Sequence, residues 1–105
     1  MAKFEKYHGA GNDFIIIDNR DLSFDASNLT LISKLCDRHF GIGSDGLMLI
    51  QNVDDADLHM LFFNPDGSQS LCGNGSRCAI AYAYKHGMIS EKGVLRTTDG
   101  RHKYE

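Results

Sequence analysis

Short apolar runs separated by turn residues recur along this chain, and they predict β-strands. Phe14 to Asp18 is an apolar run rich in β-branched residues, which is typical of a buried strand. Three more strands are expected at Lys3 to His8, Leu47 to Gln51 and Leu58 to Phe63. The glycine-rich segment from Gly9 to Asn12 is expected to form the turn between the first two strands.

Two further turns are predicted in the second half of the chain. The proline of Asn64-Pro65-Asp66-Gly67 presets φ at the second position of a β-turn. Val94 to Thr98 and Arg101 to Glu105 flank Asp99-Gly100, the favoured pair for a two-residue hairpin turn. The sequence stops inside the second strand of this hairpin, where a natural domain rarely ends, so we expect a truncated piece of a longer protein.

Two segments carry the periodicity of amphipathic helices. The first runs from Asn28 to His39, with Ser27 as its expected N-cap and Gly41 as its stop. The second runs from Gly75 to His86 and is expected to end at Gly87. The expected apolar faces are Leu29, Ile32, Leu35 and Cys36 in the first helix, and Ala79, Ile80, Ala83 and Tyr84 in the second.

Composition narrows the class of protein. A chain of 105 residues with 42% hydrophobic and 24% charged residues is typical of one soluble globular domain. Its net charge of −3 and its scattered Lys and Arg residues argue against a nucleic-acid partner. No apolar run approaches the ~18 residues of a membrane span, and no signal segment opens the chain. Three cysteines without regular spacing fit a reducing compartment, so we expect a cytoplasmic protein without a membrane partner.

Two common kinds of binding site are not expected. Gly41, Gly43 and Gly46 match the dinucleotide pattern G-x-G-x-x-G, but they follow a predicted helix and precede a strand, which is the reverse of its required context. There is no C-x-x-C, and the one close pair of ligand types is Cys36 with His39. We therefore expect neither a bound nucleotide nor a metal.

The most informative segment is Cys72-Gly73-Asn74-Gly75-Ser76-Arg77-Cys78, between a predicted turn and a predicted helix. A helix N-terminus presents free N–H groups and a positive dipole end, which lower the pKa of a thiol below ~8.5. The glycines let backbone amides approach and hold a carboxylate. A thiolate beside such a cradle suits proton abstraction from an amino acid. The alternative is that Cys72 is a small buried side chain at a turn.

Two asparagines could assist such a site. Asn12 follows Gly9-Ala10-Gly11, and Asn64 ends a predicted strand. An Asn side chain offers donors and acceptors, which suits a substrate with an α-amino and an α-carboxylate group. The alternative for both residues is turn formation, in which Asn is favoured.

Four blocks of sequence together resemble the diaminopimelate epimerase family. They occur in the order that the family shows and span nearly the whole chain. The resemblance is specific because the four blocks occur together. The blocks are Gly9-Ala10-Gly11-Asn12-Asp13-Phe14, Arg38 to Leu47, Phe63 to Ser68, and Cys72 to Cys78.

The resemblance implies an α+β fold, in which a mixed, barrel-like sheet surrounds a central helix. Such a domain is one of two pseudo-symmetric halves, with the active site in the cleft between them. It further implies interconversion of LL- and meso-diaminopimelate, on the route to lysine and to cell-wall precursors, without pyridoxal phosphate, metal or another cofactor. Residues 1–105 would be the N-terminal domain, and the C-terminal domain would be absent.

The family's functional residues map onto five positions of this chain. Cys72 matches the catalytic cysteine of the first half. Asn12 and Asn64 match substrate-binding asparagines, and Gly73 and Asn74 match the pair whose backbone amides face the substrate carboxylate. Where some members have a Gln that contacts substrate, this sequence has Gly46, so no side-chain role is carried to that position.

The implied mechanism uses two thiols on opposite faces of the α-carbon. The second cysteine belongs to the missing half, and neither Cys36 nor Cys78 is expected to replace it, since both lie within predicted helices and are expected to be structural. The fragment alone is therefore expected to be inactive.

Other readings remain open. One is a related racemase or isomerase of the same fold, although proline-racemase-like enzymes usually carry Cys-Gly-His-Gly and phenazine-biosynthesis-like enzymes lack the cysteine. Another is a non-catalytic binding module, which could pair as a homodimer through the exposed cleft face.

Overall fold

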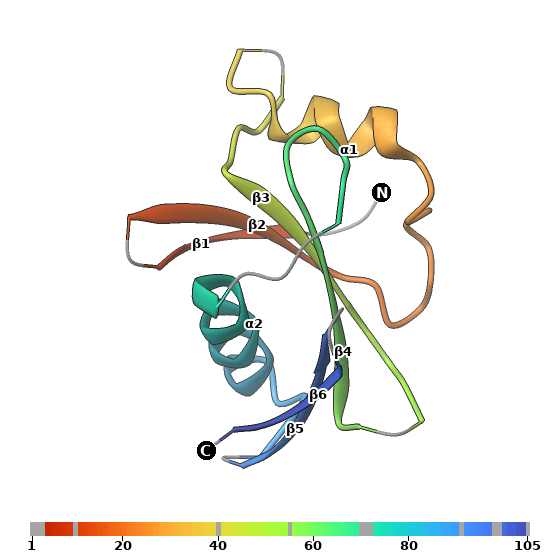
Figure 1. Ribbon diagram of the computed structural model, residues 1–105, viewed down its shortest axis with the longest axis vertical. Coiled ribbons are helices and arrows are strands. Elements are labelled where there is room, and N and C mark those ends of the chain that lie inside the picture. The colour runs from red at the N-terminus through yellow and green to blue at the C-terminus, as the bar shows by residue number, and fades with distance from the viewer. Residues whose placement is uncertain are drawn as a thin grey trace.

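Six strands make one mixed sheet within the part of the chain that the computed structural model describes, namely residues 4–9, 11–39, 41–54, 56–69, 73–90, 92–97 and 100–104 (Figure 1). Their spatial order follows the order of the sequence. The strands are β1 (Phe4–Gly9), β2 (Asn12–Asp18), β3 (Gly46–Gln51), β4 (Leu58–Phe63), β5 (Gly93–Thr97) and β6 (Gly100–Tyr104).

Hairpins and helical crossovers alternate along the sheet. The pairs β1–β2, β3–β4 and β5–β6 are antiparallel, whereas β2–β3 and β4–β5 are parallel. The helix α1 (Leu29–Cys36) connects the first parallel pair, and α2 (Gly73–Lys85) connects the second. The sheet curves into a half-barrel with α2 against its concave face, as the resemblance implied, while α1 packs on the other face (Figure 1).

The alternation of side chains along the strands builds a separate apolar cluster on each face of the sheet. Even-numbered residues of β2 and β3 pack with α2, and odd-numbered residues of the same strands pack with α1. The α2 cluster contains Phe14, Ile16, Met48, Ile50, Leu58, Met60, Phe62, Cys78, Ala79, Tyr82, Ala83 and Leu95. The α1 cluster contains Ile15, Ile17, Phe24, Ile32, Cys36, Leu47, Leu49 and Phe63.

The strand predictions are confirmed, with β4 at its predicted bounds and the others displaced by one or two residues. The β-turn is confirmed too, because the Gly67 N–H donates to the Asn64 carbonyl at 2.8 Å. The predicted position of the last hairpin turn, at Asp99-Gly100, was wrong by one residue. Thr97 pairs with Gly100, so residues 98 and 99 connect the strands, and both lie outside the described residues.

The predicted bounds of the first helix were wrong at both ends. Asn28, rather than Ser27, is the N-cap, because its Oδ1 accepts from the Leu31 N–H at 3.1 Å. Ser27 instead donates to Asp25. The helix ends at Cys36 instead of His39, since Asp37 takes an extended conformation with ψ near 126°.

The second helix begins at Gly73, two residues before its predicted start, and ends at Lys85. Gly87 follows with a φ of +70°, as expected of a glycine after a helix. The prediction that Tyr84 is buried was wrong, since 52% of this residue is exposed. Tyr82 fills the core in its place and meets Tyr7 of β1 edge to face, with the ring centroids 5.9 Å apart.

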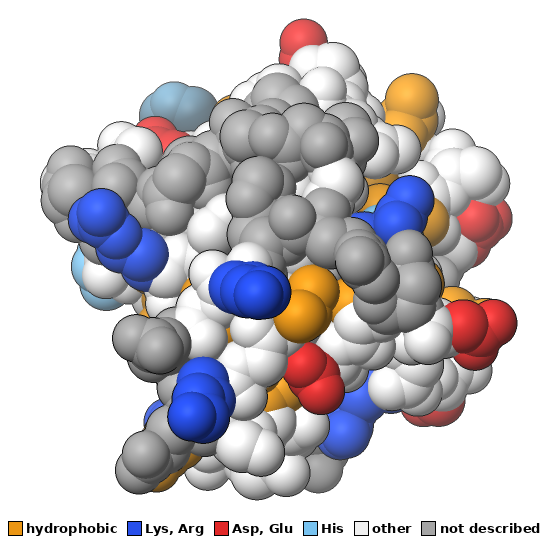
Figure 2. Space-filling view, turned by 60° about the horizontal axis from the view of Figure 1, so that its bottom comes forward, with side chains coloured by type: hydrophobic (Ala, Val, Ile, Leu, Met, Phe, Trp, Pro, Cys, Tyr) orange, Lys and Arg blue, Asp and Glu red, His pale blue; other side chains and the backbone are white. Residues whose placement is uncertain are grey.

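On the face drawn in Figure 2, the side chains of the described residues show no gathering of one charge. There the described Lys and Arg side chains lie apart from one another, between acidic and uncharged groups. Among the described residues, no helix combines the length and apolarity needed to cross a membrane.

Candidate active site

Both predicted substrate-binding asparagines lie at the same end of the sheet. Phe14 pairs with Gly46, and Leu47 pairs with Phe63, so the start of β2, the start of β3 and the end of β4 coincide. Asn12 is the first residue of β2, and Asn64 directly follows β4. Asn12 shares the even numbering of Phe14 and Ile16, so its side chain leaves β2 on the concave, α2-facing side.

The N-terminus of α2 points to this same end. Near the C-terminal end of the helix, Lys85 donates to Glu5 at 3.1 Å and His86 contacts the same carboxylate. One turn earlier, Tyr82 meets Tyr7. Four helical residues and two strand residues both span about 6–7 Å, so α2 runs antiparallel to β1. The start of the helix therefore lies toward the β1–β2 hairpin, which Asn12 closes.

The side chains of the two asparagines have different surroundings. Asn12 is partly buried, and its side chain forms no hydrogen bond with the residues that the structure describes. The Asn64 side chain donates to the Ser68 hydroxyl at 3.0 Å, and its backbone N–H donates to the Ser68 carbonyl at 2.7 Å. Asn64 thus takes part in the turn, whereas the amide of Asn12 is available to a ligand.

Two of the remaining predicted site residues, Gly73 and Asn74, open α2. The backbone of Gly73 and Asn74 forms the first two positions of the helix, where N–H groups have no partner within the helix, and its first turn holds no acidic residue. The side chain of Asn74 and the whole of Cys72 lie outside the described residues.

A charged cluster on the opposite face of β2 was not predicted. The Asp13 carboxylate accepts from Lys6 at 2.7 Å, from Arg38 at 2.8 and 3.2 Å, and from the Asp45 N–H at 3.0 Å. In return, Asp45 accepts from the Asp13 N–H at 3.1 Å and from Arg38 at 3.1 Å. The Arg38 guanidinium holds the pKa of Asp13 far below its usual range. These residues lie in or near the motif blocks. Their complementary charges are the one signal in the sequence that could have suggested this cluster.

The two described cysteines lie in the core, as expected of structural residues. Cys36 and Cys78 are both buried, and they lie in different apolar clusters on opposite faces of the sheet. Burial raises the pKa of the Cys36 thiol, and the Ser44 hydroxyl lies 3.5 Å from its sulfur. A raised pKa keeps this thiol protonated and unreactive.

The glycines of the G-x-G-x-x-G pattern serve packing. A Cβ on Gly41 would lie 1.9 Å from the Lys34 carbonyl oxygen, and one on Gly46 would lie 2.5 Å from the Phe62 ring. The pattern follows α1 and leads into β3, the context that argued against a dinucleotide site. The Phe62 ring also occupies the space into which a side chain at position 46 would project.

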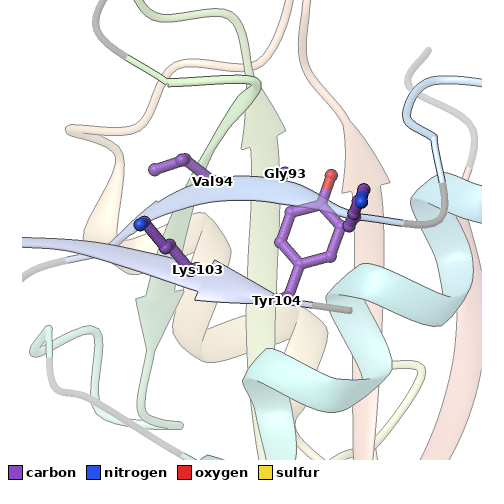
Figure 3. A pocket seen from close by; sticks show the side chains of 5 residues that line it. Gly93, Val94, Lys103 and Tyr104 are labelled. Carbon is purple, nitrogen blue, oxygen red and sulfur yellow. The ribbon is translucent and has the colours of Figure 1, made fainter.

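Two hollows lie away from Asn12 and Asn64. One, of about 350 Å³, is lined by Asp18, Arg20, Asp21 and Asn52 near the far end of β2. The other, of about 280 Å³, lies between β5 and β6, where the Tyr104 ring reaches toward Gly93 (Figure 3). Neither is lined by a predicted site residue. Among the described residues, no group of three or more His, Cys, Asp or Glu side chains could hold a metal ion.

Comparisons with known proteins agree with the sequence motifs. The family model described as diaminopimelate epimerase matches residues 4–104. The diaminopimelate epimerase of Flavobacterium psychrophilum is 52% identical over 101 residues, which cover 95% of this chain and 40% of that protein. That of Aquifex aeolicus is 42% identical and covers 98% of this chain and 40% of its own length. The chain thus spans about 40% of the length of these curated relatives.

Solved structures of low sequence identity share the fold. A PhzF-family phenazine biosynthesis protein from Enterococcus faecalis superimposes with a TM-score of 0.75 at 10% identity, over 98% of this chain and 40% of that chain. A hydroxyproline epimerase from Agrobacterium vitis gives 0.64 at 16% identity, over 97% of this chain and 36% of that chain. These two likenesses establish the fold alone. The match of the family model over residues 4–104, joined by the curated relatives, shows that the chain belongs to the diaminopimelate epimerase family.

Proposed function

We propose that this chain is the N-terminal domain of an enzyme that interconverts LL- and meso-diaminopimelate in the cytoplasm, for lysine and cell-wall precursor synthesis. The observation that carries the proposal is the match of the diaminopimelate epimerase model along residues 4–104. The location of Asn12, Asn64 and the start of α2 toward one end of the sheet supports it.

In the proposed reaction, the Cys72 thiolate removes the α-proton of the substrate and becomes a thiol. The electron pair stays on the α-carbon, and a thiol on the opposite face donates its proton to it and becomes a thiolate. The configuration is thereby inverted, with no net gain or loss of protons and no cofactor. The second thiol belongs to the part of the enzyme outside this chain, since Cys36 and Cys78 are buried in apolar clusters.

The remaining residues would bind and orient the substrate. The backbone N–H groups of Gly73 and Asn74 at the start of α2 suit a carboxylate, because the positive end of the helix dipole favours an anion there. The Asn12 and Asn64 amides offer donors and acceptors to the α-amino and carboxylate groups. Holding the α-carbon between the two thiols is what makes a weak carbon acid reactive.

The partner of this domain would be the C-terminal domain of the same enzyme, which supplies the second thiol and closes the cleft. The 105 residues alone would then hold half of the site. We expect the purified fragment to show no turnover of diaminopimelate, even if two copies associate through the cleft face as a homodimer. Turnover by the fragment near the rate of the intact enzyme would contradict this part of the proposal.

The decisive experiment follows α-proton exchange of diaminopimelate in deuterated water, catalysed by the intact enzyme. We expect exchange with inversion by the wild type, and a loss of about 10²–10⁴-fold in Cys72→Ser, the range that a general base contributes. Cys36→Ala is the matched control, because this thiol is buried on the other face of the sheet and should leave the exchange rate nearly unchanged.

Exchange that does not depend on Cys72 would remove its catalytic role. Absence of exchange with diaminopimelate in the wild type would reject the proposed substrate. A related racemase or isomerase, or a non-catalytic binding module, would then be the better reading.

A further inference from the structure

Asn12 and Asp13 are neighbours in β2, and their side chains leave the strand on opposite faces. Asn12 faces the α2 side, where the proposed substrate would lie. Asp13 faces the α1 side, and 13% of its side chain is exposed. Because one backbone carries both side chains, whatever fixes Asp13 also fixes the backbone from which the Asn12 side chain projects.

Asp13 is held by three residues from two separate segments of the chain. Lys6 reaches it from β1, while Arg38 and the Asp45 N–H reach it from the segment between α1 and β3. The Asp45 N–H also donates to the Asp13 carbonyl at 3.0 Å. Two cationic and two anionic side chains thus join the β1–β2 hairpin to the start of β3.

The two ends of β2 differ in whether their ion pairs join segments that are distant in the sequence. At the far end, Asp18 and Arg20 form an ion pair with contacts of 2.9 and 3.0 Å, but these residues are two positions apart in the sequence. That pair ties together no distant segments, and no predicted site residue lies beside it. The tip of the β1–β2 hairpin, in contrast, contains Gly11 with a φ of +88°, a backbone state that glycine adopts freely. The hairpin tip therefore needs an external brace if Asn12 is to keep one orientation.

We propose that Asp13 and Arg38 are positioning residues, which hold the hairpin so that the Asn12 amide faces the substrate without touching the substrate themselves. This inference rests on the proposed function, because it takes Asn12 as a substrate ligand. The bidentate geometry of Arg38 fixes the angle of the carboxylate as well as its distance, which a single point charge does not do.

The test uses the intact enzyme and the variants Arg38→Gln and Arg38→Lys, with Arg20→Gln as the matched control. Each Arg forms a bidentate ion pair with an Asp of β2. We expect kcat/KM for diaminopimelate to fall about 10–100-fold in Arg38→Gln, by the usual effect of a misplaced binding group. Arg38→Lys should recover part of the loss, and Arg20→Gln should stay within about twofold of the wild type.

A double-mutant cycle with Asn12→Ala separates positioning from a general loss of stability. If Arg38 acts through Asn12, Arg38→Gln should cost little further activity once the Asn12 amide is gone. Equal fold losses with and without Asn12 would overturn the proposal, and so would equal effects of Arg38→Gln and Arg20→Gln.

A readout independent of turnover keeps the positioning role separate from the proposed function. Amide hydrogen exchange over residues 9–13 should become faster in Arg38→Gln and not in Arg20→Gln. Unchanged exchange would overturn the positioning role of Asp13 and Arg38, even in an active enzyme. Faster exchange in a protein that does not act on diaminopimelate would reject the proposed function but would still support this positioning role.

Discussion

At the scale of single residues, Asp13 combines a shielded carboxylate with two cationic partners. Its pKa lies far below the ordinary 3.8 because Arg38 and Lys6 stabilise the ionised form more than burial opposes it. The sequence could predict the burial of Cys36, since this residue falls on the predicted apolar face of its helix. It could not predict the bracing of Asp13, because its partners are 7, 25 and 32 residues away.

The lowered pKa predicts how the stability contributed by this pair depends on pH. A group whose pKa is lower in the folded than in the unfolded state adds stability above its unfolded value and loses it as the pH falls toward the folded value. The stability difference between wild type and Arg38→Gln should therefore be largest near pH 7 and shrink below about pH 4. Urea unfolding at several pH values measures it, and a difference that stays constant from pH 7 to 3 would contradict the prediction.

At the scale of elements, the strands were predictable because buried apolar runs alternate with turn residues. The end of α1 was not predictable, because its last carbonyl groups are capped from downstream. The N–H groups of Gly43 and Ser44 donate to the carbonyls of Leu35 and Cys36 at 3.0 and 3.1 Å. The chain must leave the helix at Asp37 to return there, which no local helix signal reveals.

The N-cap of α1 gives a test at this scale. Asn28→Ala removes the Oδ1 that accepts from the Leu31 N–H, and this should cost about 1 kcal/mol of unfolding free energy. Ser27→Ala is the matched control, because its hydroxyl bonds Asp25 at the surface and caps no helix, so it should cost less than about 0.5 kcal/mol. Chemical denaturation of both variants measures the two costs. A larger loss in Ser27→Ala would restore Ser27 as the cap.

At the scale of the whole molecule, the hand of the crossovers explains why the helices lie on opposite faces. β2 and β3 are parallel to each other, and β4 and β5 run the opposite way, while the sheet grows in one lateral direction. Crossovers of parallel strands are almost always right-handed, so reversing the strands moves the second helix to the other face. The elements were predictable from the sequence, but the half-barrel was implied by resemblance, because periodicity does not reveal which strands pair.

The two apolar clusters share β2 and β3, so we expect both layers to unfold together. Ile32 of α1 is fully buried, and Ile32→Ala should cost about 2–5 kcal/mol through the cavity it leaves. Because alternate residues of the same strands face α1 and α2, the loss should reach α2 as well. Hydrogen exchange in increasing urea should show equal falls in the midpoints of α1 and α2 peptides. The neighbouring Leu31→Ala, at a residue that is 37% exposed, should have a much smaller effect. An α2 midpoint that stays at the wild-type value would mean that the two layers unfold separately. The sheet would then transmit no stability from its α1-facing side to its α2-facing side, where the proposed active site lies.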